Sequence, residues 1–178
     1  MIFQLHIQLL GIKPLIWRRI QVKSGITLHR LDHIIQNAMG WGECHLTEFE
    51  IDGMRYGDSE LEDFDTGILE TRKYKVTCKL LKKKQVFKFI YDFGDNWQHK
   101  IKVEDIFEPE IGVFYPRCID GARACPQEDT GGPFGYKEYL EALIDPNHER
   151  HEELIEWGGD FDPEYFDKDE VNEYLKNG

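Results

Sequence analysis

The sequence predicts a single α+β domain over residues 1–178, in which helices pack on one side of a largely antiparallel sheet and the C-terminal third is helical. The first two thirds contain segments where apolar and polar residues alternate, the pattern of half-buried strands. The last third instead carries apolar residues at helical spacing. The length suits one domain, and 40% hydrophobic with 13% aromatic residues are enough for one core. Strands followed by helices are typical of the α+β class.

An N-terminal hairpin is the first element that the sequence predicts. Residues 2–10 alternate between apolar and polar side chains, which indicates a half-buried strand. A turn follows at residues 11–14, and residues 15–22 predict the second strand of the hairpin.

A helix is predicted over residues 28–39. Thr27 is a suitable N-cap and Gly40 a suitable C-terminal stop. A short strand is expected near residues 46–51, and the acidic stretch 57–70 predicts a long irregular loop.

The middle of the chain predicts a meander of three consecutive antiparallel strands. The strands are expected at residues 73–81, 85–93 and 97–104, with tight turns between them. Together with the N-terminal hairpin they would form the sheet.

Residues 108–135 are rich in proline and glycine and predict an ordered loop without regular structure. The helical third follows, with a helix at 135–144 and a second helix that Asp145-Pro146 would start and that would end near residue 157. Asp167 and Glu170 have the spacing of a capping box before a final helix.

The formal net charge is −12, from 22 basic and 34 acidic residues. The last 41 residues hold 14 of the acidic residues and only three basic ones. Binding to a polyanion needs a basic surface, so this balance argues against nucleic acid as the main partner. The chain has no apolar run long enough to cross a membrane and no signal-peptide pattern, so we expect a cytoplasmic protein with no membrane partner. Four cysteines in such a protein do not imply disulfides.

Five separated motifs, in order along essentially the whole chain, resemble the Ri-plasmid open-reading-frame-3-like family. The motifs are Pro14 to Arg19, Met39-Gly40-Trp41 with His45-Leu46, Tyr91 to Asp95 with Trp97 and His99, Cys118 with Gly121, and Cys125 to Tyr136.

The resemblance implies an association with mobile elements, because some family members are labelled passenger or resolvase-like proteins of insertion elements. It implies no established biochemical role. Members often have a cysteine where this chain has Thr130, so any three-cysteine metal site of the family would be incomplete here.

Our first functional hypothesis is a non-enzymatic binding or interaction domain with an unknown protein or small-molecule partner. Its groove would lie between the sheet and the loop at 117–136. The expected lining residues are Trp17, Arg18, Trp41, His45, Asp95, Trp97, His99, Glu128 and Asp129.

A metal-dependent hydrolase is the alternative hypothesis. Asp92, Asp95 and His99, with Glu128 and Asp129, could ligate a divalent metal or act as acid and base. The structural alternative is that Asp95 serves an ordinary turn and that His99 is a core residue on the apolar face of its strand.

No cofactor is predicted, although zinc or another divalent metal is an open alternative at Cys118, Cys125, His148 and His151. Thiolates and imidazoles are zinc ligands, but the spacings within these pairs are not those of common zinc sites. The competing interpretation is two thiols packed in a loop.

A DNA-associated accessory protein is a second alternative. Recombinase chemistry is disfavoured, because Ser24 and Ser59 lie in turn-like contexts and the late tyrosines Tyr165 and Tyr174 lie in the most acidic segment. The sequence assigns no catalytic residue.

Overall fold

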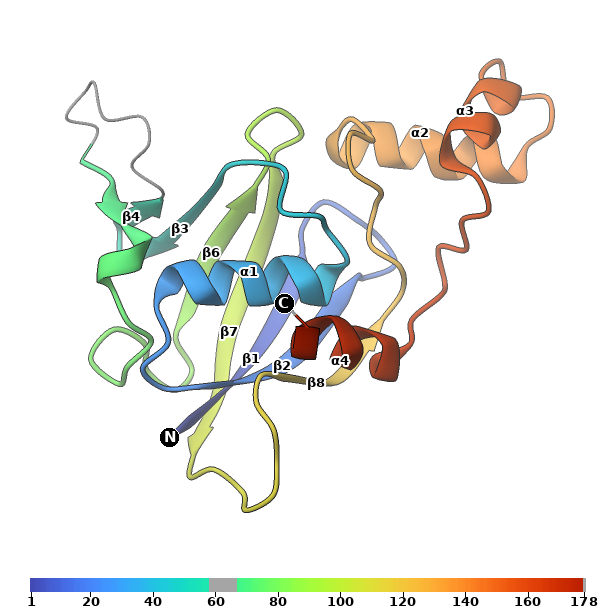
Figure 1. The fold of residues 1–178 in the computed structure, drawn as a ribbon. Coiled ribbons are helices and arrows are strands. Elements are labelled where there is room, and N and C mark those ends of the chain that lie inside the picture. Colours follow the sequence, from blue (N-terminus) through green and yellow to red (C-terminus); the bar gives the residue numbers. More distant parts are fainter. Residues whose placement is uncertain (58–66, 178) are drawn as a thin grey trace.

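The computed structural model describes residues 1–57 and 67–177 and confirms the α+β class. Its strands are β1 (Ile2–Leu9), β2 (Trp17–Lys23), β3 (Thr47–Ile51), β4 (Met54–Gly57), β5 (Leu69–Glu70), β6 (Val86–Tyr91), β7 (Trp97–Phe107) and β8 (Arg117–Ala122). Its helices are α1 (Leu28–Met39), α2 (Gly132–Ile144), α3 (His151–Gly158) and α4 (Lys168–Asn177), with a 3₁₀ turn at Thr71–Lys73. The strands form one sheet in the order β5-β4-β3-β6-β7-β1-β2-β8, antiparallel except for the β4–β5 pair (Figure 1).

The N-terminal hairpin is confirmed and lies inside the sheet. β1 pairs with β2 on one side and with β7 on the other. The predicted alternation holds, because Phe3, Leu5, Ile7 and Leu9 are fully buried on one face of the sheet.

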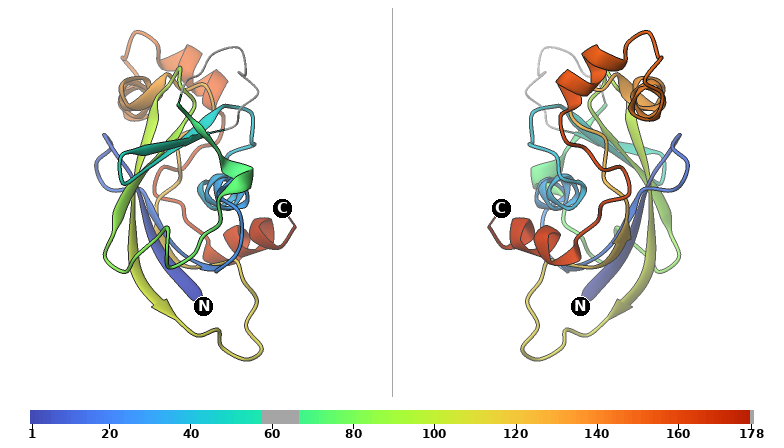
Figure 2. Two further views of the ribbon diagram at one scale, coloured as in Figure 1. Left: turned by 90° about the vertical axis from the view of Figure 1, so that its left-hand side faces the viewer. Right: turned by 90° about the vertical axis from the view of Figure 1, so that its right-hand side faces the viewer.

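Helix α1 lies across that buried face, and α4 packs beside α1 and β8 (Figures 1 and 2). The predicted ends of α1 are confirmed: Thr27 Oγ1 accepts a hydrogen bond from the Arg30 amide at 3.1 Å, and Gly40 ends the helix at φ 91°. Helices α2 and α3 pack on each other at one end of the sheet. The other face of the sheet carries no helix within the described ranges (Figure 2).

The prediction of a strand at 73–81 is wrong. The Tyr74 carbonyl accepts a hydrogen bond from Leu28 N, the Val76 amide donates to the carbonyl of residue 26, and the Val76 carbonyl accepts from the amide of residue 25. This segment therefore pairs with the chain that leads into α1. The strand beside β6 is β3 instead, with Phe49 opposite Phe89. The three-strand meander is therefore reduced to the β6–β7 hairpin.

The expected loop at 108–135 contains an edge strand, β8, which among the described strands pairs with β2 alone. An edge position tolerates prolines and glycines nearby, and these residues obscured the strand in the sequence. The sequence analysis also missed strand β4. The expected loop at 57–70 falls largely on residues 58–66, which lie outside the described residues.

The C-terminal third is helical as predicted, with one boundary corrected. Helix α3 starts at His151, because Asp145 ends α2 instead of starting the next helix. Asp167 does cap α4, since its Oδ1 accepts from the amides of Asp169 and Glu170 at 2.7 and 3.1 Å. No helix in the described part of the chain is long and apolar enough to span a membrane.

Candidate functional site

An imidazole surrounded by carboxylates forms the first candidate site, at the end of β6. His45 Nδ1 lies 3.7 Å from Asp92 Oδ2, and its Nε2 lies 3.6 Å from Glu128 Oε2 and 3.6 Å from Asp129 Oδ1. These separations exceed those of hydrogen bonds. Ligand atoms of His45, Asp92 and Asp129 all lie within 4.8 Å of one another, so these three residues could hold a metal ion.

Local backbone structure positions the carboxylates. Asp92 follows β6 at φ 56°, and its Oδ1 accepts from Gly94 N at 2.8 Å. Glu128 Oε1 accepts from Gly42 N at 2.9 Å and from the Tyr91 hydroxyl at 2.7 Å. Burial and the bond to Glu128 raise the pKa of Tyr91, so the hydroxyl stays a proton donor.

Trp41 joins the 126–129 segment to the sheet. Its indole Nε1 donates to the Pro126 carbonyl at 2.9 Å, and its ring stacks on Tyr91 at 4.6 Å. Trp41 is a core residue with 4% of its surface exposed. Its hydrogen bond to Pro126 therefore ties the segment that carries Glu128 and Asp129 to the core, at the end of β6.

A cavity of about 520 Å³ is the second candidate site, and we call it the α1–α4 cavity. It lies between the end of α1, the chain after β8, and α4. Its lining includes Arg18, Met39, Trp41, Ala124, Cys125, Tyr165, Phe166, Val171 and Tyr174.

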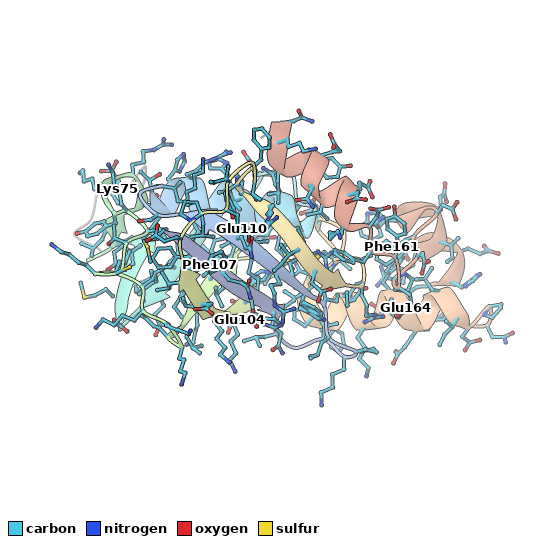
Figure 3. The ribbon with its side chains drawn as sticks, turned by 90° about the horizontal axis from the view of Figure 1, so that it is seen from below. Lys75, Glu104, Phe107, Glu110, Phe161 and Glu164 are labelled. Atoms are coloured by element: carbon cyan, nitrogen blue, oxygen red, sulfur yellow. The ribbon has the colours of Figure 1, made fainter. Side chains whose placement is uncertain are left out.

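The segment between α3 and α4 closes one side of this cavity. Ala124 N donates to the Pro163 carbonyl at 3.2 Å, and the buried Arg123 pairs with Glu164 at 2.7 Å. Figure 3 labels Phe161 and Glu164 on this segment. At the other side, the Asn172 amide of α4 exchanges two hydrogen bonds with the backbone of Cys118, at 2.8 and 2.9 Å.

The chain belongs to the plasmid pRiA4b ORF-3-like family. The family model of that description matches residues 1–170. A curated relative, the uncharacterized protein y4hQ of Sinorhizobium fredii (strain NBRC 101917 / NGR234), is 39% identical over 162 residues, which are 90% of this chain and 82% of the relative. A crystal structure of a protein of unknown function, MM3350 from Methanosarcina mazei Go1, is also similar, with a TM-score of 0.85 and 39% identity over 96% of this chain and 97% of that one.

Residues of the family motifs contribute to both candidate sites. Of the expected lining residues, His45, Glu128 and Asp129 meet at the carboxylate cluster. Arg18 and Trp41 line the α1–α4 cavity instead.

Four other expected lining residues lie elsewhere. Asp95 Oδ2 accepts from Gly131 N at 3.0 Å, so this carboxylate bonds to the start of α2 and not to the local turn amides that the sequence suggested. Trp97 is buried in the core. Trp17 stacks on His6, outside the lining of the cavity.

His99 is the fourth of these residues and is fully buried, with Nδ1 3.3 Å from the Phe89 carbonyl. Burial lowers its pKa to about 4, so the ring is neutral at physiological pH. The structure therefore separates His99 from the carboxylates that the hydrolase hypothesis combined with it.

The structure does not bring the four expected zinc ligands together. Cys118 Sγ donates to the Asp120 carbonyl, and Cys125 Sγ contacts Met39. His148 Nδ1 accepts from the Arg150 amide, and His151 Nδ1 lies 2.7 Å from the Ala142 carbonyl. Among the described residues, these four side chains form no common group of metal ligands.

Sequence reasoning missed the wall of the cavity that α4 provides. Phe166 and Val171 were not expected at a site, and Tyr165 was considered only as a nucleophile. The available signal was the pair of aromatic residues Tyr165-Phe166 immediately before the Asp167 cap, since an aromatic pair there must pack against something or stay exposed.

Proposed function

We propose that the chain is a small-molecule-binding domain and that its ligand occupies the α1–α4 cavity. The observation that carries the proposal is the cavity itself, whose volume of about 520 Å³ falls in the range of small-molecule sites. Its lining combines apolar and aromatic side chains with a few polar groups, the usual composition of such sites.

The anchoring of α4 supports a preformed site. The Asn172 bonds to Cys118 and the Arg123–Glu164 ion pair hold the two ends of the covering segment independently. A cavity whose walls are held in place before binding has a smaller ordering cost when a ligand enters.

Binding of N-phenyl-1-naphthylamine, an uncharged aromatic probe that fluoresces in apolar surroundings, tests the proposal. Val171 lines the cavity, so Val171→Phe should fill part of it and weaken probe binding about tenfold or more. Glu173→Phe is the matched control, because Glu173 is exposed on the same helix and lies outside the lining. Equal affinity in the wild type and both variants would reject the cavity as the binding site.

The carboxylate cluster supports a second candidate function, the binding of a divalent cation by His45, Asp92 and Asp129. Several carboxylates around one imidazole concentrate negative charge that a cation would neutralise, and both residue types are ligands of divalent metals. This set replaces the combination of Asp92, Asp95 and His99 that the hydrolase hypothesis used.

Thermal unfolding with and without Mn²⁺ or Zn²⁺ tests this candidate. The metal should raise the melting temperature of the wild type and of Asp95→Asn, whose carboxylate lies outside the set. It should not raise that of Asp129→Asn. If none of the three proteins responds to either metal, the cation site is rejected.

A further inference from the structure

Arg18 is a buried cation without an acidic partner. It is 4% exposed, and no carboxylate in the described part of the chain lies within ion-pair distance of it. The neighbouring arginines differ, because Arg19 pairs with Glu104 and the buried Arg123 pairs with Glu164. A buried charge is costly unless it is paired, so Arg18 requires an explanation.

Neutral groups satisfy most of the guanidinium. Nε donates to the Ala38 carbonyl at 3.0 Å, and Nη1 donates to the carbonyls of Trp17 and Ala122 at 2.9 and 3.0 Å. Nη2 has only the Cys125 sulfur, at 3.4 Å, although it carries two N–H groups. One donor of Nη2 is thus free of any partner among the described residues, and Arg18 and Cys125 both line the α1–α4 cavity.

The other groups around the cavity do not neutralise Arg18. Burial raises the pKa of the Cys125 thiol, so the sulfur remains protonated and uncharged. Asp167 accepts two amide hydrogen bonds at the start of α4, and Glu170 accepts from the hydroxyls of Tyr165 and Tyr174. These two carboxylates therefore bond to the first amides of α4 and to the hydroxyls of Tyr165 and Tyr174, and not to Arg18.

We propose that the α1–α4 cavity binds a small organic anion whose charged group takes the free donor of Arg18 Nη2 and whose apolar body lies against Phe166 and Val171. This inference rests on the proposed small-molecule site and names its ligand class. The Phe166 ring, with its centroid 4.6 Å from the Arg18 guanidinium carbon, already holds the cation in place, so a planar anion would meet a preoriented donor and an aromatic wall together.

Two fluorescent probes separate the charge from the apolar body. 8-Anilinonaphthalene-1-sulfonate carries the same two aromatic groups as N-phenyl-1-naphthylamine and adds a sulfonate. A hydrogen bond between charged groups in a buried site should make the sulfonate bind about tenfold or more tightly than the neutral probe.

Substitutions at Cys125 test whether Arg18 is responsible. Cys125→Asp places a carboxylate beside Nη2, where the ligand's anion would otherwise lie, and should remove the preference for the sulfonate while the neutral probe still binds. Cys125→Ser is the matched control without charge and should keep the preference. Ala124→Asp, at a half-buried lining position, supplies a second variant if Cys125→Asp fails to fold.

The outcomes distinguish the two proposals. Equal affinity for both probes in the wild type, or a preference that survives both aspartate variants, overturns the anion inference alone. Failure of both probes to bind, or binding that Val171→Phe leaves unchanged, overturns the small-molecule site and the anion inference with it.

Discussion

Replacing Gly121 with alanine should destabilise the protein by pushing Phe166 away from Arg18. Gly121 lies on β8, where an added Cβ would be 2.5 Å from Cζ and 2.7 Å from Cε2 of Phe166. The same Cβ would lie 3.0 Å from Arg18 Cδ, and the backbone of Gly121 is outside the left-handed region, so the penalty in the folded state is steric and does not come from backbone strain. Overpacking costs about 1–3 kcal/mol and the stiffer unfolded chain returns about 0.4–1 kcal/mol, which leaves a net loss of roughly 1–2 kcal/mol.

Urea unfolding of the wild type, Gly121→Ala, Phe166→Ala and the double variant measures this effect as a coupling energy. Without the Phe166 ring, the nearest remaining atom is Arg18 Cδ at 3.0 Å, so the alanine at 121 should cost less than it does in the wild type, and the cycle should give a coupling of about 1 kcal/mol or more. Gly42→Ala is the control, because a Cβ there would meet only Cys44 Sγ at 3.5 Å, an ordinary contact. A cost of the same size with and without Phe166 would refute the assigned contact.

Three further predictions concern stability, pH and nucleic acid. Thr27→Ala should lower the free energy of unfolding by about 1 kcal/mol in urea titrations, because it removes the cap of α1, whereas Thr27→Ser should not. His99 binds a proton in the unfolded state at its ordinary pKa near 6.5 but in the folded state only near pH 4, so its contribution to stability is present above pH 6.5 and is lost as the pH falls towards 4. Urea titrations should therefore show that the free energy of unfolding falls less between pH 7 and pH 5 in His99→Phe than in the wild type, by roughly 1–2 kcal/mol. An equal fall in the two proteins would contradict the lowered pKa of His99. Electrophoretic mobility of duplex DNA at low ionic strength should be unchanged by the protein, and a salt-sensitive shift would favour the DNA-associated alternative.

Local patterns predicted those elements whose partners are near in sequence. The alternation of β1, the capped ends of α1 and the Asp167 cap of α4 are short-range signals, and the structure confirms all three. The segment at 73–81 has the composition of a strand, but composition does not specify a partner. Its buried Val76 packs where the chain enters α1, and the backbone bonds to residues 25 and 26 follow from that packing.

The residues of the carboxylate cluster were predictable from the sequence because they lie in recognisable motifs. His45, Glu128 and Asp129 come from two separate motifs that the fold brings together. Trp17 and Arg18 show the limit of this reasoning, because adjacent strand residues point to opposite faces and only Arg18 reaches the cavity. The α4 wall requires a helix that begins about 130 residues after the end of α1 to pack beside α1, which no local pattern can specify.

If the α1–α4 cavity binds an anion as proposed, the acidic C-terminal third and the buried Arg18 would together favour a small anion over a polymeric one. Some carboxylates in the C-terminal third form ion pairs with arginines that lie outside the cavity: Glu164 pairs with Arg123, and Glu138 pairs with Arg150. Arg18, which lines the cavity, has no carboxylate partner among the described residues. Asp167 and Glu170 line the cavity but are exposed. Exposed charges are screened over about 8 Å at physiological salt, so these carboxylates and the other acidic side chains would oppose a single small anion only weakly. A nucleic acid would bring many phosphates against the same acidic surface, so the electrostatic repulsion would grow with each contact. It is also too large to enter the cavity, so its phosphates would not reach Arg18. The negative net charge and an anion site are therefore compatible, provided that the anion is small enough to pass into the α1–α4 cavity.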